Sequence, residues 1–331
     1  MQGFSSPQWF NQYFPSDKGN KHHAYIVGGR KGLGKTNFSL EFSQSMLCSD
    51  KFTVCCNKCD ACKLYSAENH PDFYNIFSEE GKQITKDHLE SIEDKIYQSS
   101  FLGGNKVLYF NTIELMNKTA SNSILKMLEE PPKDTYFILS TNRIKNINPT
   151  ILSRCSEILI KTPSREEAVQ WLKDQGNHDL KTINLALDCA SGRPMIAQEM
   201  IDKNFLELRK YFVSSISELL KNGSNLMVLA DEWSKDKNTL PFQLEWLSIL
   251  LMETIRFHSY KGNKEFLEDT KKISFYLGEN SNINDLFSLL NETNNMWSLV
   301  SNGTSLRLDY QLQSLFIKWE EKLGIRRVKK I

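Results

Sequence analysis

The stretch GGRKGLGKTNF, residues 28–38, decides the fold class of this 331-residue chain. It contains the pattern G-x-x-x-x-G-K-[ST], preceded by the apolar run AYIV (24–27) and followed by residues with helical spacing. Glycines let backbone N–H groups turn toward phosphate oxygens, and the N-terminus of the helix adds positive charge. We therefore predict a P-loop in which the lysine reaches the β- and γ-phosphates and the threonine binds magnesium. The residues expected to contact nucleotide here are Gly29, Gly32, Gly34, Lys35 and Thr36.

Strand-like and helix-like segments alternate around this loop as far as about residue 160. Near-continuous apolar runs of this kind are typical of strands buried on both faces of a parallel sheet. The alternation predicts a doubly wound α/β domain over residues 1–162. The expected strands are AYIV (24–27), FYNIF (73–77), KVLYF (106–110), TYFILST (135–141) and SEILI (156–160).

The rest of the chain shows only helical patterns. Ser164 with Glu167 three residues later resembles a capping box that starts the first of these helices. We predict a small helical domain at 163–206 and a larger all-α domain at 207–331.

Five of the seven cysteines fall between residues 48 and 62. The C-x-x-C-x-x-C pattern of Cys56, Cys59 and Cys62 can direct thiolates at one ion, and four thiolates complete a tetrahedral zinc site. We expect Cys48 as the fourth ligand, with Cys55 as the alternative, because ligands adjacent in sequence strain the backbone. The sequence thus predicts a structural Zn²⁺ module at about 48–72; a redox dithiol is the other interpretation.

The composition excludes some classes of protein. Forty-one basic and forty acidic residues leave a net charge of +1, which argues against a protein that coats nucleic acid. No apolar run approaches the roughly 18 residues of a membrane span, and the N-terminus lacks the pattern of a secretory signal. We expect a cytoplasmic protein without a membrane partner.

The segment KVLYF ends without the acid that a P-loop hydrolase needs. Such enzymes hold magnesium with an Asp at the end of a second strand. Here Asn111 and Thr112 follow the strand, and Glu114 is the alternative acid three residues beyond Asn111. We expect a pocket that hydrolyses ATP poorly or not at all, and the sequence leaves open whether ATP or ADP with Mg²⁺ occupies it.

Several segments together resemble the clamp-loader subunits of bacterial DNA polymerase III, which are proteins of the AAA+ class. These are the P-loop, the cysteine insertion after its helix, ENHPDFYNI (68–76), residues 106–142 and NPTILSRCSEILI (148–160). The resemblance is specific over roughly residues 20–162. It implies that the two helical domains are a lid and an oligomerisation collar, and that Thr141 and Asn142 sense the γ-phosphate. It also implies that Arg154 is an arginine finger for a neighbouring subunit; taken without the family, Arg154 is expected to pair with a local carboxylate.

Two departures distinguish subunit types within this family. Motor subunits of the gamma/tau type carry Asp-Glu where this chain has Asn111 and Thr112, and a sensor arginine where it has Pro194, with Arg193 adjacent. Both departures match the stationary, delta-prime type. The resemblance implies a non-motor subunit of the clamp loader that supports ATP-dependent loading of the sliding clamp on primed DNA, with motor and clamp-opening delta subunits as partners. The alternatives are an active clamp-loader ATPase that uses Glu114 and a stand-alone zinc-dependent nucleic-acid binder.

Overall fold

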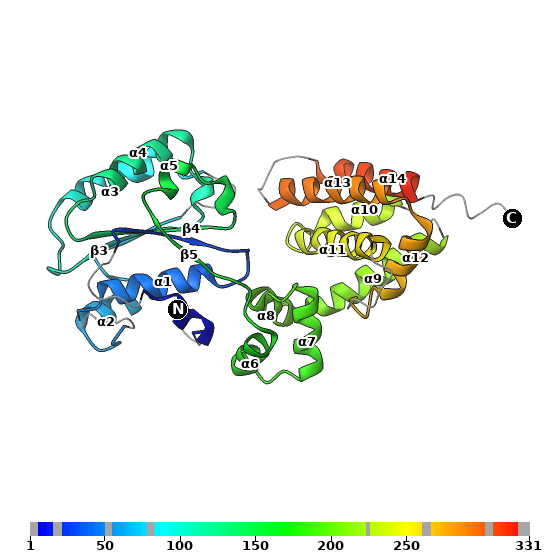
Figure 1. Cartoon of the computed structure of the whole chain (residues 1–331), viewed down its shortest axis with the longest axis horizontal. Helices are drawn as coiled ribbons and strands as arrows, with labels where there is room; N and C mark the ends of the chain where they lie inside the picture. Colours follow the sequence, from blue (N-terminus) through cyan, green and yellow to red (C-terminus); the bar gives the residue numbers. More distant parts are fainter. Residues whose placement is uncertain are drawn as a thin grey trace. The chain divides into compact units, whose positions relative to one another are not determined.

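The computed structural model forms two compact units, Met1–Glu199 and Met200–Ile331. It describes residues 6–15, 22–49, 55–77, 83–222, 226–259, 266–301 and 307–323. The first unit contains the α/β part of the chain together with the helices as far as residue 199 (Figure 1). The domain boundaries expected after residues 162 and 206 remain predictions.

A parallel sheet of five strands, in the order β2-β3-β4-β1-β5, forms the centre of the described part of the first unit. Every residue of β1 and of β3 is buried, as expected for strands covered on both faces. The predicted α/β class and all five strand positions are therefore confirmed. The strands are β1 (Ala24–Gly28), β2 (Phe73–Ile76), β3 (Lys106–Phe110), β4 (Thr135–Thr141) and β5 (Ser156–Leu159).

Helices cover both faces of this sheet. In Figure 1, α3, α4 and α5 lie on one face, and α1 and α2 lie on the other. On the first face, buried residues such as Leu108, Ile124 and Phe137 form one apolar core. On the second face, Phe38 and Phe42 of α1 are buried. These helices are α1 (Lys35–Leu47), α2 (Asp60–Ser66), α3 (Lys86–Tyr97), α4 (Lys118–Glu129) and α5 (Pro149–Leu152).

Two further parts of the first unit pack beside α1. The 3-10 helix η1 (Gln8–Tyr13) buries Trp9 and Phe10, whose rings lie 5.9 Å from Trp171 and 5.5 Å from Phe38. The predicted capping box is present, since the Glu167 N–H donates to the Ser164 hydroxyl and the Ser164 N–H to the Glu167 carboxylate. The helices after β5 are α6 (Arg165–Gln175), α7 (Leu180–Cys189) and α8 (Pro194–Asp202).

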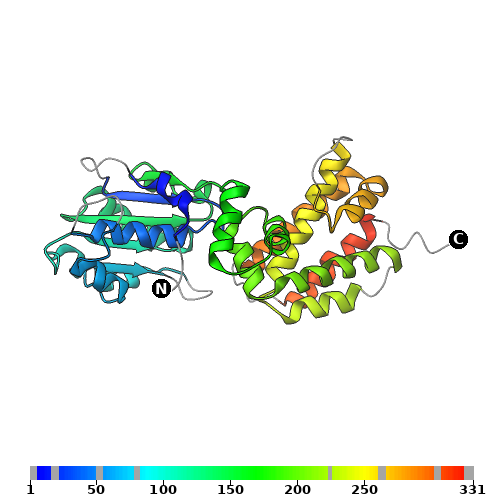
Figure 2. The ribbon, with the colours of Figure 1, turned by 90° about the horizontal axis from the view of Figure 1, so that it is seen from below.

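The second unit is helical throughout the part that the structure describes (Figure 2). Trp233, Trp246 and Trp319 are almost completely buried, and the Trp233 ring lies 5.2 Å from that of Phe316. These three tryptophans are therefore part of the helical core of this unit. Among the described residues, no helix combines the length and apolar character that crossing a membrane requires. The helices are α9 (Phe205–Asn222), α10 (Leu226–Lys235), α11 (Leu240–Ser259), α12 (Lys271–Asn280), α13 (Ile283–Ser301) and α14 (Leu308–Leu323).

Candidate nucleotide site, metal centre and arginine finger

The predicted P-loop connects β1 to α1, at the carboxyl edge of the sheet. Gly32 and Gly34 both have φ near +86°, in the left-handed region that glycine adopts without a steric penalty. Gly34 caps α1, so the unpaired N–H groups of the first turn point out of the helix at Lys35 and Thr36. The loop has the local geometry that binds anions at the start of a helix.

The P-loop lysine is engaged by its own chain. Lys35 is buried, and its Nζ donates to the Arg30 carbonyl at 2.9 Å and to Asn142 Oδ1 at 2.8 Å. Burial lowers the pKa of Lys35 to about 8, because the charged form loses hydration. Asn142, one predicted sensor, therefore lies at the P-loop, whereas Thr141 is fully buried and its Oγ1 accepts from the Arg143 N–H.

The end of β3 presents neutral groups only. Asn111 Oδ1 accepts from the Ser140 hydroxyl at 3.2 Å, and the Thr112 N–H donates to the same hydroxyl at 3.0 Å. These bonds join the end of β3 to β4. A divalent cation at this position gains no anionic ligand from Asn111 or Thr112.

Glu114 lies closer to the P-loop than its place in the sequence indicated. The short helix η2 (Ile113–Leu115) turns the chain back, so that Glu114 Oε1 accepts from the Asn142 N–H at 2.8 Å. Its Oε2 is buried and has no hydrogen-bond partner among the described residues. Glu114, Asn142 and Lys35 thus form one connected polar group, in which the negative charge of Glu114 favours the charged form of Lys35.

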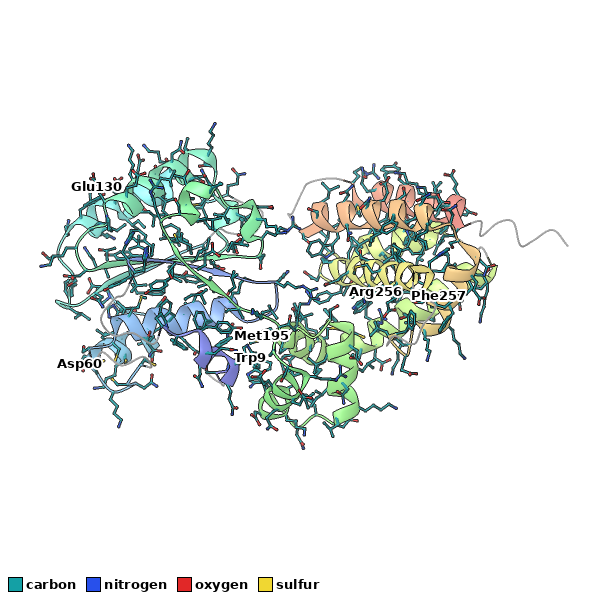
Figure 3. The ribbon with its side chains drawn as sticks, viewed as in Figure 1. Trp9, Asp60, Glu130, Met195, Arg256 and Phe257 are labelled. Atoms are coloured by element: carbon teal, nitrogen blue, oxygen red, sulfur yellow. The ribbon has the colours of Figure 1, made fainter. Side chains whose placement is uncertain are left out.

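Apolar side chains pack directly on the P-loop. The Met195 N–H donates to the Gly32 carbonyl at 3.2 Å, which joins the start of α8 to the loop. A Cβ added to Gly32 would overlap Ile196, and one added to Gly34 would lie 2.7 Å from both Met195 and Phe10. Figure 3 shows Met195 and Trp9, the neighbour of Phe10, in this region.

Arg193, the residue before Pro194, contacts backbone carbonyls of its own chain. Its side chain is buried, and its Nε donates to the Ala190 carbonyl at 2.7 Å. A second nitrogen, Nη1, lies 3.5 Å from the Lys31 carbonyl. The guanidinium therefore bonds to backbone of its own chain next to the P-loop.

The structure brings together the four cysteines predicted to bind metal, Cys48, Cys56, Cys59 and Cys62. All four sulfurs lie within 4.8 Å of one another, and two pairs are 3.9 and 4.0 Å apart. A regular tetrahedron with Zn–S bonds of about 2.3 Å has S···S edges of about 3.8 Å. The cysteines fit a closed four-thiolate zinc site with little rearrangement.

Backbone donors favour the thiolate form of Cys56 and Cys59, whereas burial raises the pKa of Cys62. Burial acts to raise the pKa of Cys59, but hydrogen bonds from the N–H groups of Cys62 and Ser49 and from the thiols of Cys62 and Cys56 together hold that pKa at about 6. Cys55 lies outside the group, with its Sγ at 3.3 Å from Asn57 Oδ1. The geometry thus favours Cys48 over Cys55 as the fourth ligand.

The predicted finger residue lies at the surface just after α5. Arg154 Nη2 forms a 2.7 Å ion pair with Glu129 Oε1, and its Nη1 donates to the Thr150 carbonyl and the Ser153 hydroxyl. Its side chain remains 31% exposed. The neighbouring Cys155 is packed inward, and burial raises the pKa of its thiol to about 12, which argues against a nucleophilic role.

Sequence reasoning missed three contributors to these sites: Phe10, Met195 and Glu129. The two apolar residues reach the P-loop from helices that come well before and long after it in the chain. The ion pair confirms the expectation that Arg154 pairs with a carboxylate of its own chain, but the sequence did not identify Glu129, in the LEEPP segment at the end of α4, as that partner.

Comparison with known proteins agrees with the resemblance described above. Residues 10–164 match the family described as "DNA polymerase III, delta subunit". The chain is 31% identical to DNA polymerase III subunit delta' of Haemophilus influenzae, with 72% of each chain covered. It is 28% identical to the proteins of the same name from Buchnera aphidicola subsp. Schizaphis graminum, covering 91% of this chain and 92% of that one, and from Pseudomonas aeruginosa, covering 91% and 93%.

Proposed function

Because the chain belongs to the family of DNA polymerase III delta' subunits, we propose that it is the stationary, non-motor subunit of the clamp loader. In this role it supports ATP-dependent loading of the sliding clamp on primed DNA. Its direct partners are the gamma/tau motor subunits and the clamp-opening delta subunit, and it meets the clamp and DNA through the complex.

The proposed function assigns a role to each part of the chain. The α/β part is an AAA+ domain, residues 163–206 form its lid, and residues 207–331 form the collar through which subunits assemble. The cysteine module at about 48–72, of which residues 50–54 lie outside the described part, is a zinc-binding insertion. Cys48, Cys56, Cys59 and Cys62 leave no open coordination position, so the zinc stabilises the fold and takes no part in chemistry.

The neutral end of β3 carries the proposal that the chain is not a motor. Asn111 and Thr112 offer an amide oxygen and a hydroxyl, and both residues already bond to Ser140. Magnesium bound to a triphosphate would lack the carboxylate that P-loop hydrolases provide. Lys35 supports the same conclusion, because its ammonium must leave Arg30 O and Asn142 Oδ1 before it can reach a phosphate.

Arg154 supplies what a stationary subunit can contribute to catalysis. Its guanidinium is a delocalised cation held at the surface. We propose that it contacts the γ-phosphate in the site of a neighbouring motor subunit. Arginine fingers of this kind raise hydrolysis rates about 10³–10⁵-fold in GTPases.

The test measures ATP hydrolysis by the isolated chain and by the reconstituted complex. We expect negligible turnover from the chain alone. Arg154→Ala should leave assembly intact and strongly lower the DNA-stimulated ATPase activity of the complex. Arg165→Ala is the matched control, because it removes another exposed arginine that is paired with a carboxylate, that of Asp188. Equal activities of the Arg154→Ala and wild-type complexes would disprove the finger assignment.

One observation favours a second candidate, an active ATPase of the motor type. Glu114 places a carboxylate beside Asn142, and its buried Oε2 has no partner among the described residues, so it is available to a metal or a water. This function predicts turnover by the isolated chain that disappears in both Glu114→Gln and Lys35→Ala.

A further inference from the structure

We infer that Glu129 is a positioning residue for Arg154: its carboxylate holds the guanidinium in the orientation in which it meets the neighbouring subunit's nucleotide. The inference rests on the proposed function, because it gives Glu129 a task only if Arg154 acts in trans.

The contacts of Arg154 come from two different elements. Nη1 donates to the Thr150 carbonyl at 2.9 Å and to the Ser153 hydroxyl at 3.2 Å. These two acceptors belong to α5 and the turn after it. Glu129 is the last residue of α4, and its Oε1 lies 2.7 Å from Nη2. Contacts on both terminal nitrogens fix the plane of the guanidinium, which contacts on one nitrogen alone would not do.

This arrangement leaves part of the guanidinium available. Among the described residues, the Nε–H of Arg154 has no hydrogen-bond partner, and the side chain is still 31% exposed. A planar cation whose two terminal nitrogens are held, and whose side chain is still partly exposed, can meet a phosphate oxygen without first losing rotational freedom. Preorganisation of this kind increases the rate only if the fixed orientation is the productive one.

The neighbouring carboxylate provides an internal control. Glu130 caps α4, is exposed and has no partner for its side chain among the described residues (Figure 3). Glu129 and Glu130 are adjacent in the chain and carry the same charge. A general electrostatic effect would involve both, whereas positioning requires Glu129 only.

The stability of the chain should not depend on this pair. The Glu129 side chain is 49% exposed, and exposed ion pairs contribute little to folding. Glu129→Gln keeps the size of the side chain and removes only its charge. We therefore expect the Glu129→Gln variant to have the same melting temperature as the wild type and to assemble normally.

The experiment uses the reconstituted complex and measures its DNA-stimulated ATPase activity over a range of ATP concentrations. Glu129→Gln should lower kcat by roughly tenfold, which corresponds to about 1.4 kcal/mol, with little change in KM. Glu129→Asp should recover part of the activity, and Glu130→Gln should match the wild type. The double variant Glu129→Gln/Arg154→Ala should be no slower than Arg154→Ala alone, because Glu129 acts only through Arg154.

The outcomes separate this inference from the proposed function. If Arg154→Ala lowers the activity but Glu129→Gln does not, or raises it, the finger stands and the positioning role is wrong. An additive loss in the double variant would also refute it, since Glu129 would then act by another route. If Arg154→Ala has no effect, the finger assignment fails, and the inference fails with it.

Discussion

Replacement of single cysteines gives a sharp test of the metal site. Four thiolates in a structural zinc site contribute about 10–16 kcal/mol of binding free energy in total, or about 2.5–4 kcal/mol for each. Cys59→Ser should therefore weaken zinc binding by about 100- to 1,000-fold. Cys55→Ser should leave it unchanged, because the Cys55 sulfur lies outside the four that converge.

The assay is zinc release to a chromophoric chelator, together with metal analysis of the purified chain. We expect one equivalent of zinc per chain in the wild type and in Cys55→Ser. A wild-type metal content far below one equivalent, or equal zinc affinities of the Cys55→Ser and Cys59→Ser variants, would refute the geometric reasoning.

Removal of zinc should loosen the module and leave the sheet intact. Apart from the converging cysteines, α2 is joined to α1 by the hydrogen bond from the Tyr65 hydroxyl to the Leu40 carbonyl, at 2.8 Å. Hydrogen exchange after chelation should therefore increase over α2 and stay unchanged in β1 and β3, whose residues are all buried. Loss of protection in β1 and β3 as well would show that the zinc stabilises the whole domain.

Three further predictions concern other parts of the chain. Gly32→Ala should lower the free energy of unfolding by about 2–4 kcal/mol, measured by denaturant titration, because φ is positive there and the new methyl group overlaps Ile196. The buried Lys35 has a pKa of about 8 in the folded chain against an ordinary 10.5. Burial of the charged ammonium therefore lowers the free energy of unfolding by its full amount below pH 8, and this loss disappears as the pH rises to 10.5. The stability of the wild type relative to Lys35→Met should therefore rise by about 3 kcal/mol across that range, and a flat difference would contradict the shift. In the second unit, Asp269→Asn should cost about 3 kcal/mol in thermal unfolding, because Arg209 is buried and Asp269 accepts from both its Nε and its Nη2; unchanged stability would show that the pair is dispensable.

The features that could be predicted are those that a short stretch of sequence determines. The P-loop glycines, the capping box at Ser164 and the five strands follow from backbone conformation and the period of apolar residues, which a short window of sequence contains. The converging cysteines were also predictable, since three of the four lie within seven residues. The strand order was not predicted, because the pairing of β1 with both β4 and β5 depends on contacts distant in sequence.

The site residues that escaped prediction share one physical property. Their roles come from side chains that meet across long stretches of chain. Met195 and Ile196 lie about 160 positions from the P-loop they cover, and Glu129 lies 25 positions from Arg154. Glu114 was identified as the alternative acid beyond the strand, but its contact with Asn142 was not predicted, because it depends on the short turn η2.

The proposed lack of ATP hydrolysis and the proposed arginine finger both favour a domain that keeps one conformation. A motor exchanges contacts around its P-loop in each cycle, so its lid must separate from the loop at low cost. Here Met195 and Phe10 pack where a Cβ on Gly34 would lie, and a nucleotide that engages Lys35 would have to replace the bonds of its ammonium to Arg30 and Asn142. We expect this cost to keep the domain in one conformation whether or not nucleotide is present. In the proposed function, Arg154 belongs to this same domain, and a rigid support would hold its guanidinium in position while a neighbouring motor subunit moves.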